Sequence, residues 1–159
     1  MKIIHAKSDQ EMDQARELFR EYESFLGVSL DFQDFQTELA GLPGKYAHPD
    51  GALFLAMNHG RVIGCGALRR LGPKEKNRCE MKRLFLRPDA RGHGTGKKLA
   101  LRIIEEAVFL GYSAMFLDTL HRLSEAMTLY EGIGFVQTPP YYDNPMPDVV
   151  YWTLDLGGN

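Results

Sequence analysis

The segment between residues 80 and 118 constrains the fold of this chain more than any other part of the sequence. A strand pattern over Glu80–Arg87 stops at Pro88, a residue that cannot continue a paired strand. A glycine-rich loop follows, and after it comes the clearest amphipathic helix, Lys97–Leu110. A second apolar strand then covers Ala114–Asp118. Strand, helix and strand in this order predict a right-handed crossover that places the two strands parallel.

The remaining patterns predict helices and antiparallel strands around this unit. Ser8 and Glu11 have the spacing of a capping box, at the start of an amphipathic helix that ends before Gly27. Two strands, Ala52–Met57 and Arg61–Leu68, flank a turn typical of a hairpin. The sequence therefore predicts an α/β fold with a mixed sheet. Further short elements are expected as strands over Lys2–Lys7, Phe135–Thr138 and Val149–Leu156, and as helices over Asp34–Ala40 and from a Ser124 cap through Ile133.

Size and composition indicate one ordinary globular domain. No linker or repeat divides the 159 residues, so we expect a single domain spanning 1–159. The net charge of −2 produces no global field that would attract nucleic acid or an anionic membrane, and we expect neither as a partner. Two cysteines without a disulfide framework, and the lack of an apolar leader, indicate a reducing, cytoplasmic location.

The loop before the long helix has the chemistry of a diphosphate site. Gly92, Gly94 and Gly96 alternate along it, which removes side chains from the backbone and permits positive φ. The helix behind the loop offers free N–H groups and the positive end of its dipole, and Arg91 and Lys97 add charge. The alternative is a flexible turn with ordinary glycine caps.

Two common nucleotide motifs do not match this loop. A phosphate-binding P-loop needs Ser or Thr after its Gly-Lys pair, and here Lys98 stands at that position. The dinucleotide pattern Gly-x-Gly-x-x-Gly is one residue out of register, because Gly96 follows Gly94 too closely. A nucleotide-binding P-loop protein is therefore disfavoured.

The spacing Arg91-Gly-His-Gly94-Thr-Gly96 resembles the coenzyme A motif of the GNAT acetyltransferases. The resemblance continues in Leu-Tyr-Glu-Gly-Ile-Gly-Phe over residues 129–135 and covers roughly residues 50–137. It implies a mostly antiparallel sheet of about six or seven strands flanked by helices, with one parallel pair at the cofactor site. It also implies that the chain transfers an acetyl group from acetyl-CoA to a primary amine, directly within a ternary complex.

The resemblance assigns roles to particular residues. The backbone of the strand before the loop would hold pantetheine, and the loop amides the diphosphate. Tyr130 would protonate the departing sulfur. Many members carry Asn seven residues before this tyrosine, where this chain has Leu123, which puts one polar cofactor contact in doubt. The cofactor-binding residues implied are Leu84, Phe85, Leu86, Arg91, Gly92, His93, Gly94, Thr95, Gly96 and Lys97.

The acceptor amine has to lose a proton. A lysine-like amine has a pKa about three units above neutrality, so only about one molecule in a thousand is nucleophilic at pH 7. A base therefore helps the reaction. Several family members place a catalytic glutamate where this chain has Glu80, on the strand beside the thioester. The alternatives are that Glu80 only pairs with Lys82, or that Asp118 or His121 is the base.

The acceptor itself is not defined by the sequence. The family places it between the N-terminal helices and the loop 139–147, and we expect a small amine, an amino acid or a peptide. Arg83 or Arg69 would then hold a carboxylate. The chain is open to pairing with a second copy as a homodimer. Aromatic residues expected to line the acceptor site are Tyr22, Phe32, Phe35, Tyr141 and Tyr142.

Other reactive residues receive ordinary interpretations. The five histidines have no ligand spacing, so we expect no metal. Cys65 and Cys79 are interpreted as small buried strand residues rather than acylated nucleophiles. The alternative function is a non-catalytic acyl-CoA sensor with the same fold.

Overall fold

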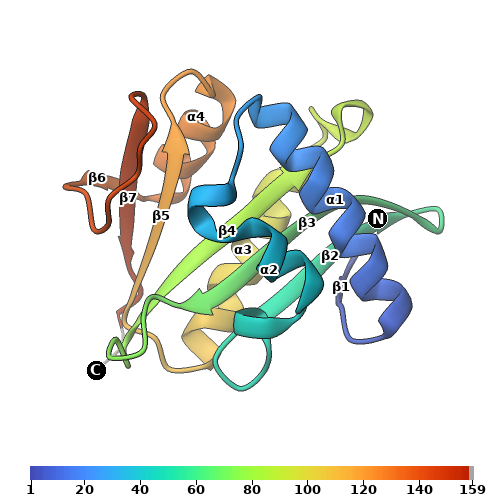
Figure 1. The fold of residues 1–159 in the computed structure, drawn as a ribbon, viewed down its shortest axis with the longest axis horizontal. Helices are drawn as coiled ribbons and strands as arrows, with labels where there is room; N and C mark the ends of the chain where they lie inside the picture. The colour runs from blue at the N-terminus through green and yellow to red at the C-terminus, as the bar shows by residue number, and fades with distance from the viewer. Residues whose placement is uncertain (158–159) are drawn as a thin grey trace.

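A computed structural model describes residues 1–157. Within this range the strands form one seven-stranded sheet in the order β1-β2-β3-β4-β5-β7-β6, and only β4 and β5 are parallel. Helices cover both faces, with α1 and α2 in front of the sheet in Figure 1 and α3 behind it. The strands are β1 Lys2–His5, β2 Ala52–Asn58, β3 Arg61–Arg70, β4 Arg78–Leu86, β5 Ala114–Leu120, β6 Val136–Thr138 and β7 Val149–Asp155. The α-helices are α1 Asp9–Leu26, α2 Phe35–Ala40, α3 Thr95–Phe109 and α4 Ser124–Ile133, with short 3₁₀ turns η1 Asp31–Gln33, η2 Gly44–Tyr46 and η3 Pro88–Ala90.

This architecture confirms the predicted fold class. The crossover β4–α3–β5 brings two parallel strands together, and the hairpin β2–β3 is antiparallel as expected. The Ser8 hydroxyl accepts the Glu11 N–H, and Glu11 reaches back to the Ser8 N–H, so the predicted capping box is present. One detail differs, because Ser124 is the first residue of α4 and the N-cap is Leu123, without a side-chain cap.

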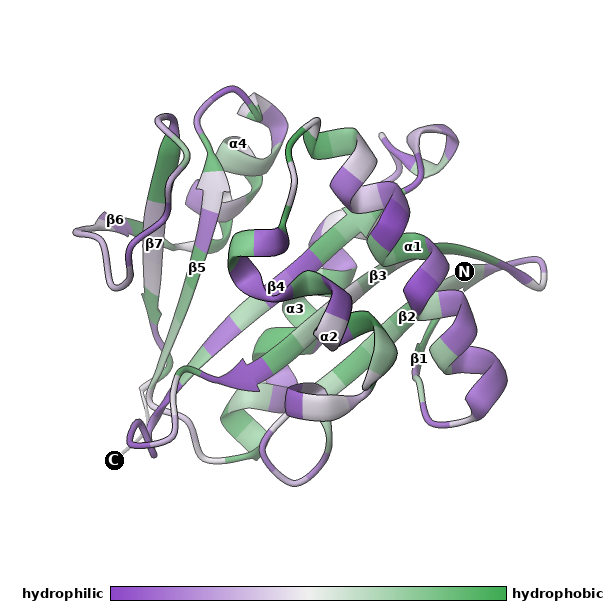
Figure 2. Cartoon of the chain, in the orientation of Figure 1, coloured by the Kyte–Doolittle hydropathy of each residue, from purple (hydrophilic) through white to green (hydrophobic). Residues whose placement is uncertain are grey.

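The sheet separates two hydrophobic cores. Side chains alternate between the faces of a strand, so Leu55 packs with α1 and α2 while its neighbour Phe54 packs on the α3 side. Phe19 of α1 and Ile103 of α3 are fully buried on opposite faces. In Figure 2 the central strands are largely hydrophobic, whereas the outer face of α1 is hydrophilic. Both faces of the sheet are therefore covered where β2–β4 run.

Candidate active site

Strands β4 and β5 are parallel neighbours over a short distance only. Their pairing comprises three residue pairs and ends where Glu80 lies beside Phe116. Beyond this point β4 contains a bulge opposite β3, because Cys65 pairs with Phe85 while Ala67 pairs with Lys82. The extra residue bends β4. As a result the two strands separate toward their C-terminal ends and leave room between them.

The bulge depends on Arg83, which has a positive φ of 60°. This conformation is uncommon for a residue with a side chain and needs support from its surroundings. The buried guanidinium donates to both carboxylate oxygens of Glu38, at 2.9 and 3.0 Å, and to Gln33 Oε1 at 2.8 Å. It also lies 5.2 Å from the ring centre of Phe35. The segment η1–α2 thus holds the bulge in place.

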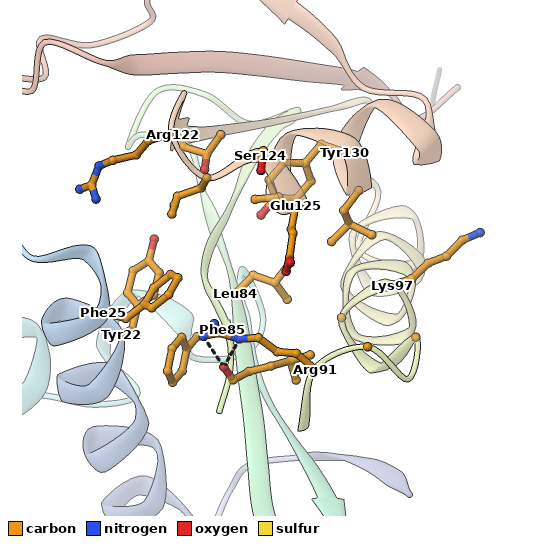
Figure 3. A pocket seen from close by; sticks show the side chains of 18 residues that line it. Tyr22, Phe25, Leu84, Phe85, Arg91, Lys97, Arg122, Ser124, Glu125 and Tyr130 are labelled. Atoms are coloured by element: carbon orange, nitrogen blue, oxygen red, sulfur yellow. Dashed lines mark hydrogen bonds between the residues drawn. The ribbon is translucent and has the colours of Figure 1, made fainter. Parts of the chain in front are cut away.

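A cleft of about 490 Å³ lies where the strands separate. Figure 3 shows Tyr22 and Phe25 of α1 on one side, Tyr130 of α4 on another, and Lys97 of α3 at the outer end. The floor is formed by the end of β4. Eight of the ten residues predicted to bind the cofactor line this cleft: Leu84, Phe85, Leu86, Arg91, Gly92, Gly94, Gly96 and Lys97.

The glycine loop has the conformation that the sequence predicts. Gly92 and Gly94 have φ values of 85° and 77°, in the left-handed region that favours glycine. Gly94 is the N-cap of α3 and has no side chain to cap the helix. Within residues 1–157 no acceptor meets the N–H groups of the first helical turn, Thr95 to Lys97. Free amides at a helix N-terminus attract anions.

Arg91 supports the loop rather than pointing away into solvent. Its guanidinium donates through Nε and Nη2 to the Leu86 carbonyl, at 3.0 and 2.9 Å, and lies 4.4 Å from the ring centre of Phe25. This contact connects the loop to the end of β4 and to α1. Of the two remaining predicted residues, His93 is exposed and Thr95 is buried in the first turn of α3. Neither lines the cleft.

The N-terminal turn of α4 forms the opposite wall. Leu123, Ser124 and Glu125 line the cleft there, together with Arg122. Sequence reasoning did not assign these residues to the site, apart from noting Leu123 as a departure. Leu123 brings an apolar side chain to this wall, where the family pattern has an amide.

Tyr130 is buried in the cleft wall on α4. Gly134, with φ of 119°, ends this helix, and the Phe135 ring packs edge-on against Tyr130. Burial raises the pKa of the Tyr130 phenol above its ordinary value. No group within residues 1–157 forms a hydrogen bond with its hydroxyl. The phenol therefore keeps its proton at neutral pH and is free to donate it.

Glu80 is buried at the point where β4 and β5 separate, and lines neither the cleft nor the cavity behind it. Its Oε2 accepts the Tyr141 hydroxyl at 2.6 Å. Its Oε1 lies 3.7 Å from Arg69 Nε and 4.0 Å from Lys82 Nζ. The expected pairing with Lys82 is thus present as a longer-range ion pair, and the role of Glu80 as a base stays a prediction.

A small inner cavity of about 30 Å³ lies behind the cleft and shares Tyr22, Thr119 and Leu123 with it. Asp118 of β5 and Lys82 of β4 both line this cavity. Asp118 Oδ2 accepts hydrogen bonds from the Tyr142 hydroxyl and, at 3.0 Å, from Asn144 Nδ2. Of the two alternative bases, Asp118 therefore faces the site, whereas His121 is exposed and lines neither space.

One hydrogen-bond network connects Lys82 and Arg83 to Asp118, and the sequence did not indicate it. Gln33 Oε1 accepts from Lys82 Nζ at 3.0 Å and from Arg83, while Gln33 Nε2 donates to the Tyr142 hydroxyl at 3.1 Å. Tyr142 in turn reaches Asp118. Gln33 lies in η1, 49 residues from Lys82, so local spacing contains no signal for this contact. Among the predicted acceptor residues, Phe32 is exposed and Phe35 is fully buried under Arg83.

The remaining reactive side chains behave as structural residues. Cys65 and Cys79 are buried and free, and burial raises the pKa of both thiols, which confirms their interpretation as buried strand cysteines. Within residues 1–157, no group of three or more His, Cys, Asp or Glu side chains is arranged to hold a metal ion. None of the helices in this part of the chain has the length and apolar character needed to cross a bilayer.

The geometry agrees with comparisons to known proteins. The sequence model of the acetyltransferase (GNAT) family matches residues 12–135. The chain belongs to the GNAT acetyltransferase family. A Schizosaccharomyces pombe protein named an uncharacterized N-acetyltransferase is 42% identical over 155 residues, which cover 97% of this chain and 94% of the relative. The GNAT chain described here is thus an acyl-CoA-dependent N-acyltransferase.

Solved structures show the same fold. The crystal structure of an acetyltransferase from Streptococcus agalactiae superimposes with a TM-score of 0.80 at 21% identity, over 97% of each chain. A Salmonella typhimurium protein named yncA, described with its cofactor acetyl-CoA, gives a TM-score of 0.71 at 19% identity, over 100% of this chain and 95% of that one. The fold of this chain is therefore shared by proteins of low sequence identity.

Proposed function

We propose that this GNAT protein transfers the acetyl group of acetyl-CoA to a primary amine by direct attack within a ternary complex. The observation that carries the proposal is the arrangement of the site. One cleft brings together the glycine loop, the first turn of α3 and Tyr130, and it adjoins a cavity lined by a carboxylate, Asp118, with which it shares Tyr22, Thr119 and Leu123. Donor and acceptor would thus approach one another from two adjoining spaces.

The cleft residues fit acetyl-CoA. Positive φ at Gly92 and Gly94 leaves the loop backbone uncovered, and a Cβ at either position would point into open space. The amides of Thr95, Gly96 and Lys97, which have no acceptor within residues 1–157, suit a diphosphate. Leu84 and Leu86 with Phe25 provide apolar walls beside the end of β4. When bound, acetyl-CoA supplies a thioester, an acyl group already activated for transfer.

Tyr130 and the carboxylates divide the proton chemistry. Tyr130, protonated and without a hydrogen-bond partner among residues 1–157, would donate its proton toward the sulfur as negative charge develops there. The amine's proton would go to one of two carboxylates. Glu80 is the base that the family pattern implies. It does not line the inner cavity itself but forms an ion pair with Lys82, which does. Asp118 lines the cavity directly.

The test is incubation with acetyl-CoA and a panel of amines, amino acids and peptides, with free thiol followed over time. We expect thiol release that requires both acetyl-CoA and an amine, and an acetylated amine by mass spectrometry. The alternative, a non-catalytic sensor, predicts thermal stabilisation by acetyl-CoA without turnover on any acceptor in the panel. If acetyl-CoA gave no thermal stabilisation and no turnover, this result would contradict both functions.

A further inference from the structure

Lys82 is a buried cation without a hydrogen-bonded counterion. Its side chain is 8% exposed and lines the inner cavity. Its Nζ donates to the neutral amide oxygen of Gln33 at 3.0 Å, and its nearest carboxylate oxygen within residues 1–157, on Glu80, lies 4.0 Å away. Burying an ammonium group away from a hydrogen-bonded partner of opposite charge is costly. The contacts of the Lys82 ammonium therefore offset its desolvation only in part.

The neighbouring cations have their own partners. Arg83 donates to both oxygens of Glu38 and to Gln33 Oε1, so its charge is matched and its Nε, Nη1 and Nη2 donors are occupied. Arg69 donates to the backbone carbonyls of Arg70 and Leu71 and lies outside the cavity wall. The two arginines expected to hold an acceptor carboxylate are thus committed elsewhere. Lys82 is the cation that both lines the cavity and lacks a close carboxylate.

Asp118 provides the opposite charge across the same cavity. Both of its hydrogen-bond donors, Tyr142 and Asn144, contact Oδ2. The other oxygen, Oδ1, has no hydrogen-bond donor within residues 1–157. Lys82 stands on β4 and Asp118 on β5, the two strands that separate at the site. Arg83 also lines the cavity, but its charge is matched by Glu38. The cavity thus presents Lys82, a cation without a hydrogen-bonded carboxylate within residues 1–157, together with the Asp118 anion, a pair that is complementary to a small zwitterion.

We propose that the inner cavity binds an amino acid, with its carboxylate on the Lys82 ammonium and its nitrogen on Asp118. The proposal rests on the acetyltransferase function above and names the chemical class of its acceptor. A cavity of about 30 Å³ has room for one small group, so the carboxylate of the amino acid would enter it while the nitrogen, a carbon or two away, stays near the adjoining cleft. The amine on the Asp118 side then stands at the border with the cleft, which Thr119 and Leu123 form.

Substitution of Lys82 tests the carboxylate contact without unfolding the protein. Burial lowers the pKa of Lys82, so the charged lysine opposes folding at neutral pH. Lys82→Met keeps the length of the side chain and removes the charge, and we expect its melting temperature to equal or exceed that of the unchanged protein. A matched control is Lys45→Met, at an exposed lysine of η2.

The decisive measurement compares amino acids with their amides. Glycine and glycinamide, and alanine and alaninamide, are assayed at equal concentrations of unprotonated amine. We expect kcat/KM to favour the acid over the amide by about tenfold or more, as for a charge-assisted hydrogen bond. Lys82→Met should lower kcat/KM for the acid by a similar factor and leave the amide unchanged. Lys45→Met should retain the preference.

Equal use of acid and amide by the unchanged protein, or an equal loss on both in Lys82→Met, would overturn the carboxylate site. A second readout does not depend on turnover. Calorimetric titration of the full chain with glycine and with glycinamide, in the presence of CoA, should give binding only for the acid, and weaker binding in Lys82→Met. If no amine is acetylated and the acid still binds through Lys82, the transfer function fails and the amino-acid site stands. If neither acid nor amide binds and amines are acetylated without preference, the reverse holds.

Discussion

Tyr130 is the side chain on which proton delivery to the sulfur depends. Its hydroxyl lies in the cleft without a partner among residues 1–157, and burial keeps it protonated. Tyr130→Phe should lower kcat on the order of a hundredfold, the usual contribution of a positioned acid. Acetyl-CoA affinity should change little, because the proton matters only as the thiolate leaves.

The measurement combines steady-state kinetics with calorimetric titration of acetyl-CoA. Tyr112→Phe is a control for the general effect of losing a buried phenol, because Tyr112 donates to the Asp50 carbonyl far from the cleft. Its turnover per folded molecule should be unchanged. Normal kcat in Tyr130→Phe would show that Tyr130 only packs against Phe135 and that the sulfur is protonated in another way.

Glu80 and Asp118 are distinguished by how the rate depends on pH. Removal of the base should lower the rate at pH 7 by about a hundredfold or more. The rate of that variant should then rise with pH, because spontaneous loss of the amine proton replaces the missing group. If the other carboxylate only binds or positions the substrate, its substitution should raise KM and leave the pH profile the same as that of the unchanged protein.

Glu80→Gln and Asp118→Asn are nearly isosteric, and both are measured as kcat and kcat/KM from pH 6 to pH 10, with melting curves to verify folding. Tyr141 offers an internal check, since its hydroxyl holds Glu80 Oε2. If Glu80 is the base, Tyr141→Phe should shift the pH profile. Near-normal rates at pH 7 in both carboxylate variants would exclude each as the base.

At the scale of elements, the glycine loop and the first turn of α3 act as one anion site. Gly94→Asp should abolish acetyl-CoA binding and leave the protein folded. Asp tolerates the left-handed conformation better than most residues, and its carboxylate would add a negative charge beside the first turn of α3. The same carboxylate would repel the diphosphate.

Gly94→Asn is the matched control, because it has the same shape and conformational tolerance without the charge. Its affinity, measured by calorimetry, should lie between those of the unchanged protein and Gly94→Asp. Equal losses in both variants would mean that the side chain excludes the ligand by size alone. Unchanged affinity in Gly94→Asp would remove the diphosphate from this loop.

The β4 bulge is the second element on which the site depends. Arg83→Met removes the partner of the half-buried Glu38 carboxylate and should lower the free energy of unfolding by about 3 kcal/mol, the scale of a broken buried ion pair. Denaturant melting measures this change. Glu38→Gln in the same chain should recover part of the loss, because it removes the unpaired charge; an additive loss would show that the two side chains act independently.

At the scale of the whole molecule, the features predicted from sequence are those that local patterns determine. The crossover from β4 through α3 to β5 follows from apolar periodicity, Pro88 and the glycines, all close in sequence. The bulge could not be predicted in this way, because Arg83 adopts a positive φ that is supported by contacts with Glu38 and Gln33, 45 and 50 residues away in the sequence. Likewise Lys82 donates a hydrogen bond to Gln33, and Asp118 accepts one from Tyr142, and both partners are distant in the sequence. The cofactor side of the site can therefore be predicted from the sequence, whereas the acceptor side depends on contacts that only the folded structure reveals.

The sheet consists of two parts that meet along a short seam. Strands β1 to β4 form one part and β5, β7 and β6 the other, and three residue pairs, Arg78–Glu80 with Ala114–Phe116, connect them. Above the seam the cleft separates the parts, with β4 and the α3 loop on one wall and the first turn of α4 on the other. A ligand in the cleft would contact both parts and stabilise their arrangement.

We therefore expect acetyl-CoA to slow amide hydrogen exchange in β5 and α4 as well as in the loop that binds it. Binding stabilises the native state by about 2.7 kcal/mol when the ligand is in hundredfold excess over Kd. The free energy of any opening that separates the two parts of the sheet should rise by this full amount. Exchange within the hairpin β2–β3, far from the cleft, should change only as far as it requires global unfolding. Mass-spectrometric exchange with and without acetyl-CoA makes the comparison, and Gly94→Asp is the control in which no protection should appear. Protection confined to the loop and α3 would mean that the seam, although it is only three residue pairs long, already holds the two parts of the sheet together without ligand.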